Sequence, residues 1–246
     1  MTKILLVGDY HVKPQMLEVV DSLAKQNAVD KIVWLGDYCD DWNKDGEQLT
    51  DALKKLLEWA DKRGDTTLLW GNHDYRYMQD PPIMNGFGYN MGYAPLIRDL
   101  FKRYSHLMRF AYYIDGWLFS HAGFTNYWCN KYLPANYKAK DIPSLLDNIS
   151  ESKGGDKIIQ SVGYARGGRD LPSPLWADWS ELCFDHLENV NQIVGHSPKK
   201  TVVNYSVPGT ELWCADTWST YSNDVPIGDG SMLLWDRGKV TKLQIR

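Results

Sequence analysis

The sequence predicts an α/β fold whose first half runs strand, helix, strand, helix, strand. Three short apolar runs, at residues 4–7, 32–35 and 66–70, have the continuous hydrophobic character of strands that are buried on both faces. Amphipathic segments separate the runs, and right-handed crossovers would make the strands parallel. We therefore expect their carboxyl ends to meet at one edge of a sheet, where open α/β sheets bind ligands.

Each of the first two helices is predicted from one apolar face. The first is expected to begin at Pro14, because proline suits a first helical position. Its apolar stripe consists of Leu17, Val20, Leu23 and Ala24. The second is expected over about residues 47–62, again with an apolar stripe on one face.

The second half of the sequence is less regular. Residues 81–92 are rich in Pro, Gly, Asn, Met and Tyr and read as a loop, and an amphipathic helix is expected at 95–104. Residues 125–172 contain little strand pattern, and we interpret them as a partly helical insertion over the site, a candidate lid. Further strands are expected at residues 110–114, 117–120, 192–194, 201–205, 211–215, 231–235 and 240–245.

Length and composition indicate one domain over residues 1–246. The chain is 43% hydrophobic and carries a formal charge of -4 with no basic run, which disfavours nucleic acid as a partner. Its four cysteines lie far apart, as in neither a disulfide framework nor a zinc finger. No apolar stretch reaches the length of a signal peptide core or a membrane span. We therefore expect a cytoplasmic protein without a membrane partner, and the oligomeric state stays open.

Polar motifs follow five of the apolar runs. They are GDYH (8–11), GDYCD (36–40), GNHD (71–74), SHAG (120–123) and GHSP (195–198). Carboxylates and imidazoles, with one amide oxygen and no thiolate in a metal-binding role, are ligands that divalent transition metals select. A single such motif is more typical of a cap or a turn former. Five of them at strand ends favour a metal site.

In this order the five motifs resemble the signature of calcineurin-like metallophosphoesterases. The resemblance is strongest to the phosphoprotein phosphatase branch, which includes bacterial and phage phosphatases and symmetrical diadenosine tetraphosphate hydrolases. It extends to PLWADW (174–179), ADTW (215–218) and GSMLLWD (230–236). The resemblance implies a metallophosphoesterase β-sandwich flanked by helices and two divalent transition-metal ions, with Mn²⁺ favoured and Fe or Zn open. The implied ligands are Asp9 and His11 for the first ion, Asp37 for both ions, and Asn72, His121 and His196 for the second.

Other residues are expected to act on the substrate. The resemblance implies that His73 is a general acid held in orientation by Asp40. Arg166 and Arg169 are candidates for binding phosphate oxygens, since a guanidinium offers a bidentate fork. The sequence departs from the phosphoprotein phosphatase pattern G-D-x-V-D-R-G at Asp41, which replaces a phosphate-binding arginine. This departure leaves the substrate class open.

The expected function is hydrolysis of phosphate monoesters by a dinuclear metal centre, with serine/threonine phosphoproteins as one candidate substrate class. A dinucleoside polyphosphate or cyclic nucleotide hydrolase is the alternative within the same chemistry. A catalytically silent binding scaffold is the alternative of another class, although such a scaffold would be expected to have lost metal ligands. The motifs do not distinguish among the candidate substrates.

Overall fold

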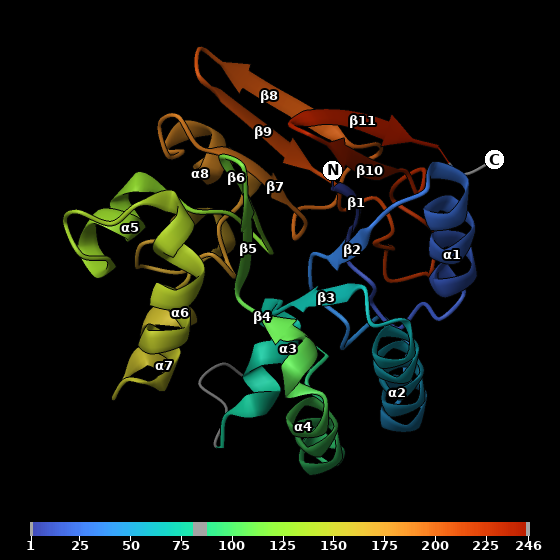
Figure 1. The fold of residues 1–246 in the computed structure, drawn as a ribbon. Coiled ribbons are helices and arrows are strands. Elements are labelled where there is room, and N and C mark those ends of the chain that lie inside the picture. Colours follow the sequence, from blue (N-terminus) through green and yellow to red (C-terminus); the bar gives the residue numbers. More distant parts are fainter. Residues whose placement is uncertain (1, 81–87, 245–246) are drawn as a thin grey trace.

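The computed structural model describes residues 2–80 and 88–244, which form two β-sheets with helices on their outer sides (Figure 1). The first sheet, in spatial order, consists of β11 (Lys239–Leu243), β10 (Met232–Asp236), β1 (Lys3–Val7), β2 (Lys31–Trp34), β3 (Thr66–Leu69) and β4 (Met108–Arg109). The second consists of β5 (Ala111–Ile114), β6 (Trp117–Ser120), β7 (Asn191–Val194), β9 (Thr210–Cys214) and β8 (Val203–Val207). The predicted β-sandwich flanked by helices is confirmed.

The predicted β-α-β-α-β unit forms the centre of the first sheet. β1 pairs with β2 and β2 with β3, both in parallel, and the connections contain α1 (Met16–Asn27) and α2 (Gly46–Arg63). The carboxyl ends of β1, β2 and β3 therefore lie at one edge, as expected. β10 pairs antiparallel with β1 on the side away from β2, and this pairing was not predicted.

The start of α1 corrects one prediction. The helix begins at Met16, whereas Pro14 had been expected as its first residue. Pro14 lies in a preceding turn, in which the amide of Met16 bonds the carbonyl of Lys13 at 2.9 Å. By contrast α2 begins with a capping box, in which Asp45 and Gln48 each accept a bond from the other's backbone amide.

Successive residues of a strand point to opposite faces of the sheet, so the residues of β1 contribute to two separate hydrophobic clusters. In β1, Ile4 and Leu6 belong to a buried cluster that also contains Phe119, Ile193 and other residues of the second sheet, so this cluster joins the two sheets. Leu5 belongs instead to the cluster that includes the buried faces of α1 and α2. The sheets are thereby held between two helical layers, and the strand edges that carry the motifs are fixed in place.

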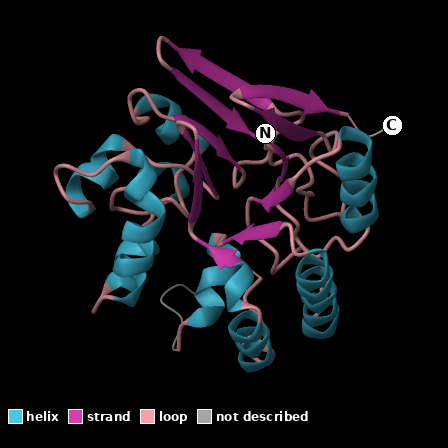
Figure 2. Cartoon of the chain, viewed as in Figure 1, coloured by secondary structure: helices cyan, strands magenta, loops and turns pink. Residues whose placement is uncertain are grey.

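The second half is helical where the sequence predicted a partly helical insertion. Residues 125–172 contain α5 (Asn126–Tyr132), α6 (Ile142–Glu151) and α7 (Gly155–Ile159), which lie on the side of the strands opposite α1 and α2 (Figure 2). The predicted helix at 95–104 is α4 (Ala94–Arg103). The helices α3 (Asn72–Tyr75) and α8 (Trp179–Phe184) were not predicted, and most of the predicted 81–92 loop lies outside the described residues.

Two further expectations concern the cysteines and the membrane. All four cysteines are free, and three of them, including Cys39, are buried. None of the helices in residues 2–80 and 88–244 has the length and apolar character needed to cross a bilayer.

Candidate metal centre

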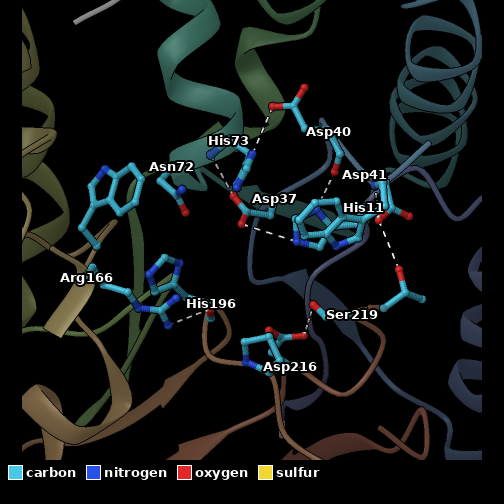
Figure 3. A pocket seen from close by; sticks show the side chains of 14 residues that line it. His11, Asp37, Asp40, Asp41, Asn72, His73, Arg166, His196, Asp216 and Ser219 are labelled. Carbon is cyan, nitrogen blue, oxygen red and sulfur yellow. Dashed lines mark hydrogen bonds and ion pairs between the residues drawn. The ribbon is translucent and has the colours of Figure 1, made fainter. Parts of the chain in front are cut away.

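Four of the five polar motifs line a cavity of about 260 Å³ at the strand edges (Figure 3), and the fifth supplies His121, whose Nε2 contacts Asn72 and His196. Seven of the ten predicted site residues line it: His11, Asp37, Asp40, Asn72, His73, Arg166 and His196. Asp9 and His121 lie behind them, with 1% and 0% of their surface exposed. Arg169 is exposed and is not among the lining residues. The structure thus brings together nine predicted residues and places Arg169 apart.

Asp9, His11 and Asp37 form the first candidate metal group. Their ligand atoms lie within 4.8 Å of one another. The Nε2 atom of His11 is 3.9 Å from Asp9 Oδ2 and 3.7 Å from Asp37 Oδ2. On its other side the ring places Nδ1 2.7 Å from the backbone oxygen of Asp40. If Nδ1 donates this bond, the Nε2 lone pair faces the two carboxylates, as a metal ligand requires.

Asp37, His121 and His196 form the second group, so Asp37 belongs to both. Their ligand atoms also lie within 4.8 Å of one another, and all three residues are buried. The Nε2 atom of His121 lies 3.4 Å from Asp37 Oδ2 and 3.0 Å from His196 Nδ1. It is also 2.9 Å from Asn72 Oδ1, while His121 Nδ1 bonds the carbonyl of Leu35 at 2.7 Å. Four atoms that can bind a metal ion therefore converge here, and with the Asp37 carboxylate ionised only the two histidine nitrogens among them can carry a proton for a hydrogen bond.

The electrostatics of this donor set fit a bound cation. Burial raises the pKa of Asp37, but the charges of His121 and His73 outweigh it and hold the pKa well below the usual range. Burial lowers the pKa of His121, but the charge of Asp37 and a hydrogen bond to it raise the pKa to about 9. Burial and His121 lower the pKa of His196 well below its usual value. A metal ion can take the place of the proton that His121 would otherwise hold.

Two motif glycines allow the carboxylates to approach the neighbouring loops. A Cβ atom on Gly71 would collide with the carboxylate and backbone of Asp37, and a Cβ on Gly195 would collide with the carboxylate of Asp9. Each glycine therefore leaves space for a candidate ligand supplied by another motif. Asp37 itself has φ of 53°, and His196 has φ of 63°, so both candidate ligands occupy the left-handed region that side chains rarely adopt.

His73, the predicted general acid, lies beside the two candidate metal groups. Its Nδ1 lies 3.1 Å from Asp40 Oδ2, and its side chain is 24% exposed, at the cavity. Asp40 is held by Arg76, which bonds the same oxygen, and by Tyr77, whose hydroxyl donates to Oδ1 at 2.6 Å. The carboxylate is therefore fixed from three sides. Neither candidate metal group contains His73 or Asp40.

Arg166 extends from the 125–172 insertion to the cavity. Its Nη2 donates to Ser197 Oγ at 2.9 Å and to the carbonyl of His196 at 3.2 Å, and its Nε lies 3.0 Å from Asp178 Oδ2. Asp178 belongs to the PLWADW segment, which thus orients this guanidinium. Among the described residues that line the cavity, Arg166 is the one lysine or arginine.

Asp41, where the sequence departs from the phosphoprotein phosphatase pattern, forms an ion pair with Lys13. Asp41 lines the cavity, and its Oδ2 accepts a bond from Lys13 Nζ at 2.7 Å, with both side chains largely buried. Lys13 also donates to the carbonyl of His11 at 3.0 Å, and Thr220 bonds Asp41 Oδ1 at 3.3 Å. The ion pair joins the segments that follow the first two motifs, and the Thr220 hydrogen bond attaches the loop after β9 to Asp41.

The sequence did not reveal the burial of two carboxylates near the candidate ligands. Asp74 accepts bonds from the amides of Tyr38, Cys39 and Gly71, so it ties the second motif to the third. Asp216 lines the cavity with 1% of its surface exposed. The pKa of Asp9 is raised well above its usual value, mainly by burial and secondly by the negative charge of Asp216. Their positions within GNHD and ADTW are the available signals, but the sequence does not show the burial and the hydrogen-bond partners that distinguish these two carboxylates.

Comparison with sequence models of protein families matches residues 2–216 to the calcineurin-like phosphoesterases. The chain belongs to this family. The match includes all five motifs and confirms the predicted resemblance and the predicted metal-dependent phosphoric ester hydrolase. Calcineurin-like phosphoesterases use two divalent metal ions, and the two donor groups that share Asp37 are the candidate ligands in this chain.

Solved structures of other phosphatases share the calcineurin-like phosphoesterase fold. A cold-active protein-tyrosine phosphatase of the psychrophile Shewanella sp. is 16% identical, with a TM-score of 0.61 over 100% of this chain and 81% of that one. A protein serine/threonine phosphatase from Saccharomyces cerevisiae is also 16% identical, with a TM-score of 0.52 over 100% and 80% of the two chains. A search of curated proteins found no significant match. At these identities the structural similarity establishes the fold.

Proposed function

We propose that this chain hydrolyses phosphate monoesters, including those of phosphoproteins, by means of two divalent metal ions with Mn²⁺ as the leading candidate. The first ion would be held by Asp9, His11 and Asp37, and the second by Asp37, Asn72, His121 and His196. The observation that carries the proposal is the shared carboxylate of Asp37 between two donor groups at the cavity. When bound, the two ions would activate water and offset the charge of the phosphoryl oxygens.

The protein residues divide the remaining tasks. Arg166 can bind oxygens of the phosphoryl group from one side of the cavity. On another side His73, oriented through Nδ1 by Asp40, can donate the proton of Nε2 to the leaving oxygen. Trp176, whose ring is 5.9 Å from that of His196, forms part of the apolar rim and can contact the leaving group.

The charge of the cavity favours a monoester over a polyphosphate. Arg166 is the single lysine or arginine among the described lining residues, so the protein offers one guanidinium and no ammonium group besides the metal ions. At Asp41 the wall carries a carboxylate whose charge is compensated by Lys13. A chain of several phosphates would leave part of its charge without a partner. The two compared phosphatases, by their names, act on phosphoproteins, which supports the same substrate class.

A substrate profile tests this proposal. The metal-reconstituted protein should be assayed on p-nitrophenyl phosphate, its bis ester, serine, threonine and tyrosine phosphopeptides, and diadenosine tetraphosphate. We expect kcat/KM for the monoesters to exceed that for the bis ester and the tetraphosphate by about 10-fold or more, which corresponds to about 1.4 kcal/mol. Preference for the tetraphosphate would instead support a dinucleoside polyphosphate hydrolase, and metal binding without turnover would support a silent scaffold.

Arg166→Ala should weaken phosphate binding without removing the metals. Loss of a charge-assisted bond to the substrate is expected to raise KM or lower kcat by an amount worth about 1.5–3 kcal/mol. Steady-state kinetics and metal analysis measure the two effects. Unchanged kinetics would show that Arg166 does not bind the substrate and has only a structural role through its contacts with Ser197 and Asp178.

Arg169→Ala is the matched substitution for the same loss of charge in the same loop. The predicted phosphate contact of Arg169 stays a prediction, since this exposed residue does not line the cavity. A loss as large as that of Arg166→Ala would support the contact. Kinetics equal to those of the wild type would show that, of the two arginines, only Arg166 can bind the phosphate.

A further inference from the structure

Asp216 is a buried carboxylate to which the proposed mechanism gives no role. It follows β9 and lines the cavity, and Figure 3 shows it beside Ser219. Its Oδ1 accepts a bond from Ser219 Oγ at 2.6 Å. Its Oδ2 is buried and has no hydrogen-bond partner in the described part of the chain. Ser219 thus orients the carboxylate and leaves one oxygen unused.

An unused carboxylate oxygen in this position is costly unless a proton or a cation neutralises it, and burial raises the pKa of Asp216 accordingly. Burying a charged group without a partner is strongly unfavourable. Asp216 also acts electrostatically on Asp9, which is itself almost fully buried, so two carboxylates repel each other in this region. The buried lysine near the first motif cannot relieve this repulsion readily, because Lys13 is paired with Asp41.

The first metal group has few ligands of its own. Asp9, His11 and Asp37 supply three donors, whereas Mn²⁺ and similar hard cations favour octahedral coordination rich in oxygen. The free oxygen of Asp216 is of the preferred type. A carboxylate next to the ion can bind it directly or hold a water molecule in its coordination sphere, and either contact increases metal affinity.

We propose that Asp216 is an outer oxygen ligand of the first metal position, acting on the ion through one water molecule, because its carboxylate lines the same cavity but is not part of the donor group of Asp9, His11 and Asp37. The inference rests on the proposed function, because it requires an ion at Asp9, His11 and Asp37. Ser219 is then a positioning residue that holds Asp216 Oδ1 so that Oδ2 faces the ion. The preferred occupant is a hard divalent cation such as Mn²⁺.

Calorimetric titration of the metal-free protein with Mn²⁺ tests the proposal without an activity assay. The wild type should show two binding events, and His11→Asn and His196→Asn identify which event belongs to which position. We expect Asp216→Asn to weaken the event that His11→Asn removes by about 10–100-fold and to leave the other unchanged. Ser219→Ala should shift the same event less. Asp224→Asn is the matched control, since Asp224 is an exposed carboxylate in the same loop.

Thermal unfolding separates a metal ligand from a structural carboxylate. Because Asp216→Asn removes a buried charge whose second oxygen is unpaired, the metal-free variant should have a Tm equal to or above that of the wild type. The increase of Tm caused by Mn²⁺ should be smaller in the variant. A lower Tm without metal together with unchanged Mn²⁺ affinity would overturn the proposal and make Asp216 structural.

The failure of this inference can be distinguished from failure of the proposed function. If the wild type binds two Mn²⁺ ions and Asp216→Asn binds both with the same affinity, the role of Asp216 is refuted while the metal centre stands. If the wild type binds no Mn²⁺, the proposed function itself fails, and the inference fails with it.

Discussion

Asp37→Asn is expected to remove both metal ions and to reduce turnover by at least about 10³-fold, since metal ions contribute several kcal/mol of transition-state stabilisation. Asp37 is the one residue common to the two donor groups. Its Oδ2 lies 3.7 Å from His11 Nε2 and 3.4 Å from His121 Nε2. An amide at this position has no charge to share between two cations. Elemental analysis after reconstitution and desalting measures the metal content.

His196→Asn is the comparison for this experiment, because His196 belongs only to the second group. It should lose one ion and retain the other at Asp9, His11 and Asp37. If Asp37→Asn kept the metal content and rate of the wild type, the shared-carboxylate arrangement would be wrong. Equal metal loss in both variants would point to collapse of the site rather than to separate positions.

His73→Asn is expected to keep both metal ions but to slow hydrolysis of esters with poor leaving groups by roughly 10²–10⁴-fold. His73 lies outside both donor groups, and its Nδ1 is 3.1 Å from Asp40 Oδ2. The leaving p-nitrophenolate needs little protonation, so the loss on p-nitrophenyl phosphate should be much smaller than on an alkyl phosphate. Asp40→Asn should have the same pattern with a milder effect, because it misorients the imidazole without removing it.

The measurement is kcat/KM for both variants across phosphate esters whose leaving groups have graded pKa values, together with metal analysis. A dependence on the leaving-group pKa that steepens in the variants would identify His73 as the proton donor. A uniform loss across the series, or loss of a metal ion, would show instead that His73 is a ligand or a structural residue.

The parts of the fold that follow from periodicity were predicted from the sequence. The β1–α1–β2–α2–β3 unit has continuous apolar strands and amphipathic helices long enough for the two periods to be distinguished. The four-residue α3 and the two-residue β4 are too short to show a period. The antiparallel pairing of β1 with β10 depends on contacts between distant segments, which a local pattern does not encode. Pro14 fitted a helix start, but local turn bonds moved that start to Met16.

The candidate site was predicted where a side chain directly follows an apolar run. Asp9, Asp37 and His196 were located in this way, since a strand end fixes the position of the next few residues. The sequence does not distinguish Arg166 from Arg169, because a glycine-rich loop has no period that would show which residue points inward. Asp216 and Arg76 were missed because their importance comes from the burial and the partners that the folded chain gives them.

The central claim is that two metal ions share the carboxylate of Asp37, and electron paramagnetic resonance of the Mn²⁺-loaded protein tests it most directly. Two Mn²⁺ ions held by donor groups with a common ligand should be magnetically coupled. We predict that the spectrum at full loading is that of a coupled pair, with two ions per chain by elemental analysis. In His196→Asn it should change to the six-line spectrum of an isolated ion. A six-line spectrum from the fully loaded wild type, or saturation at one ion per chain, would contradict the account.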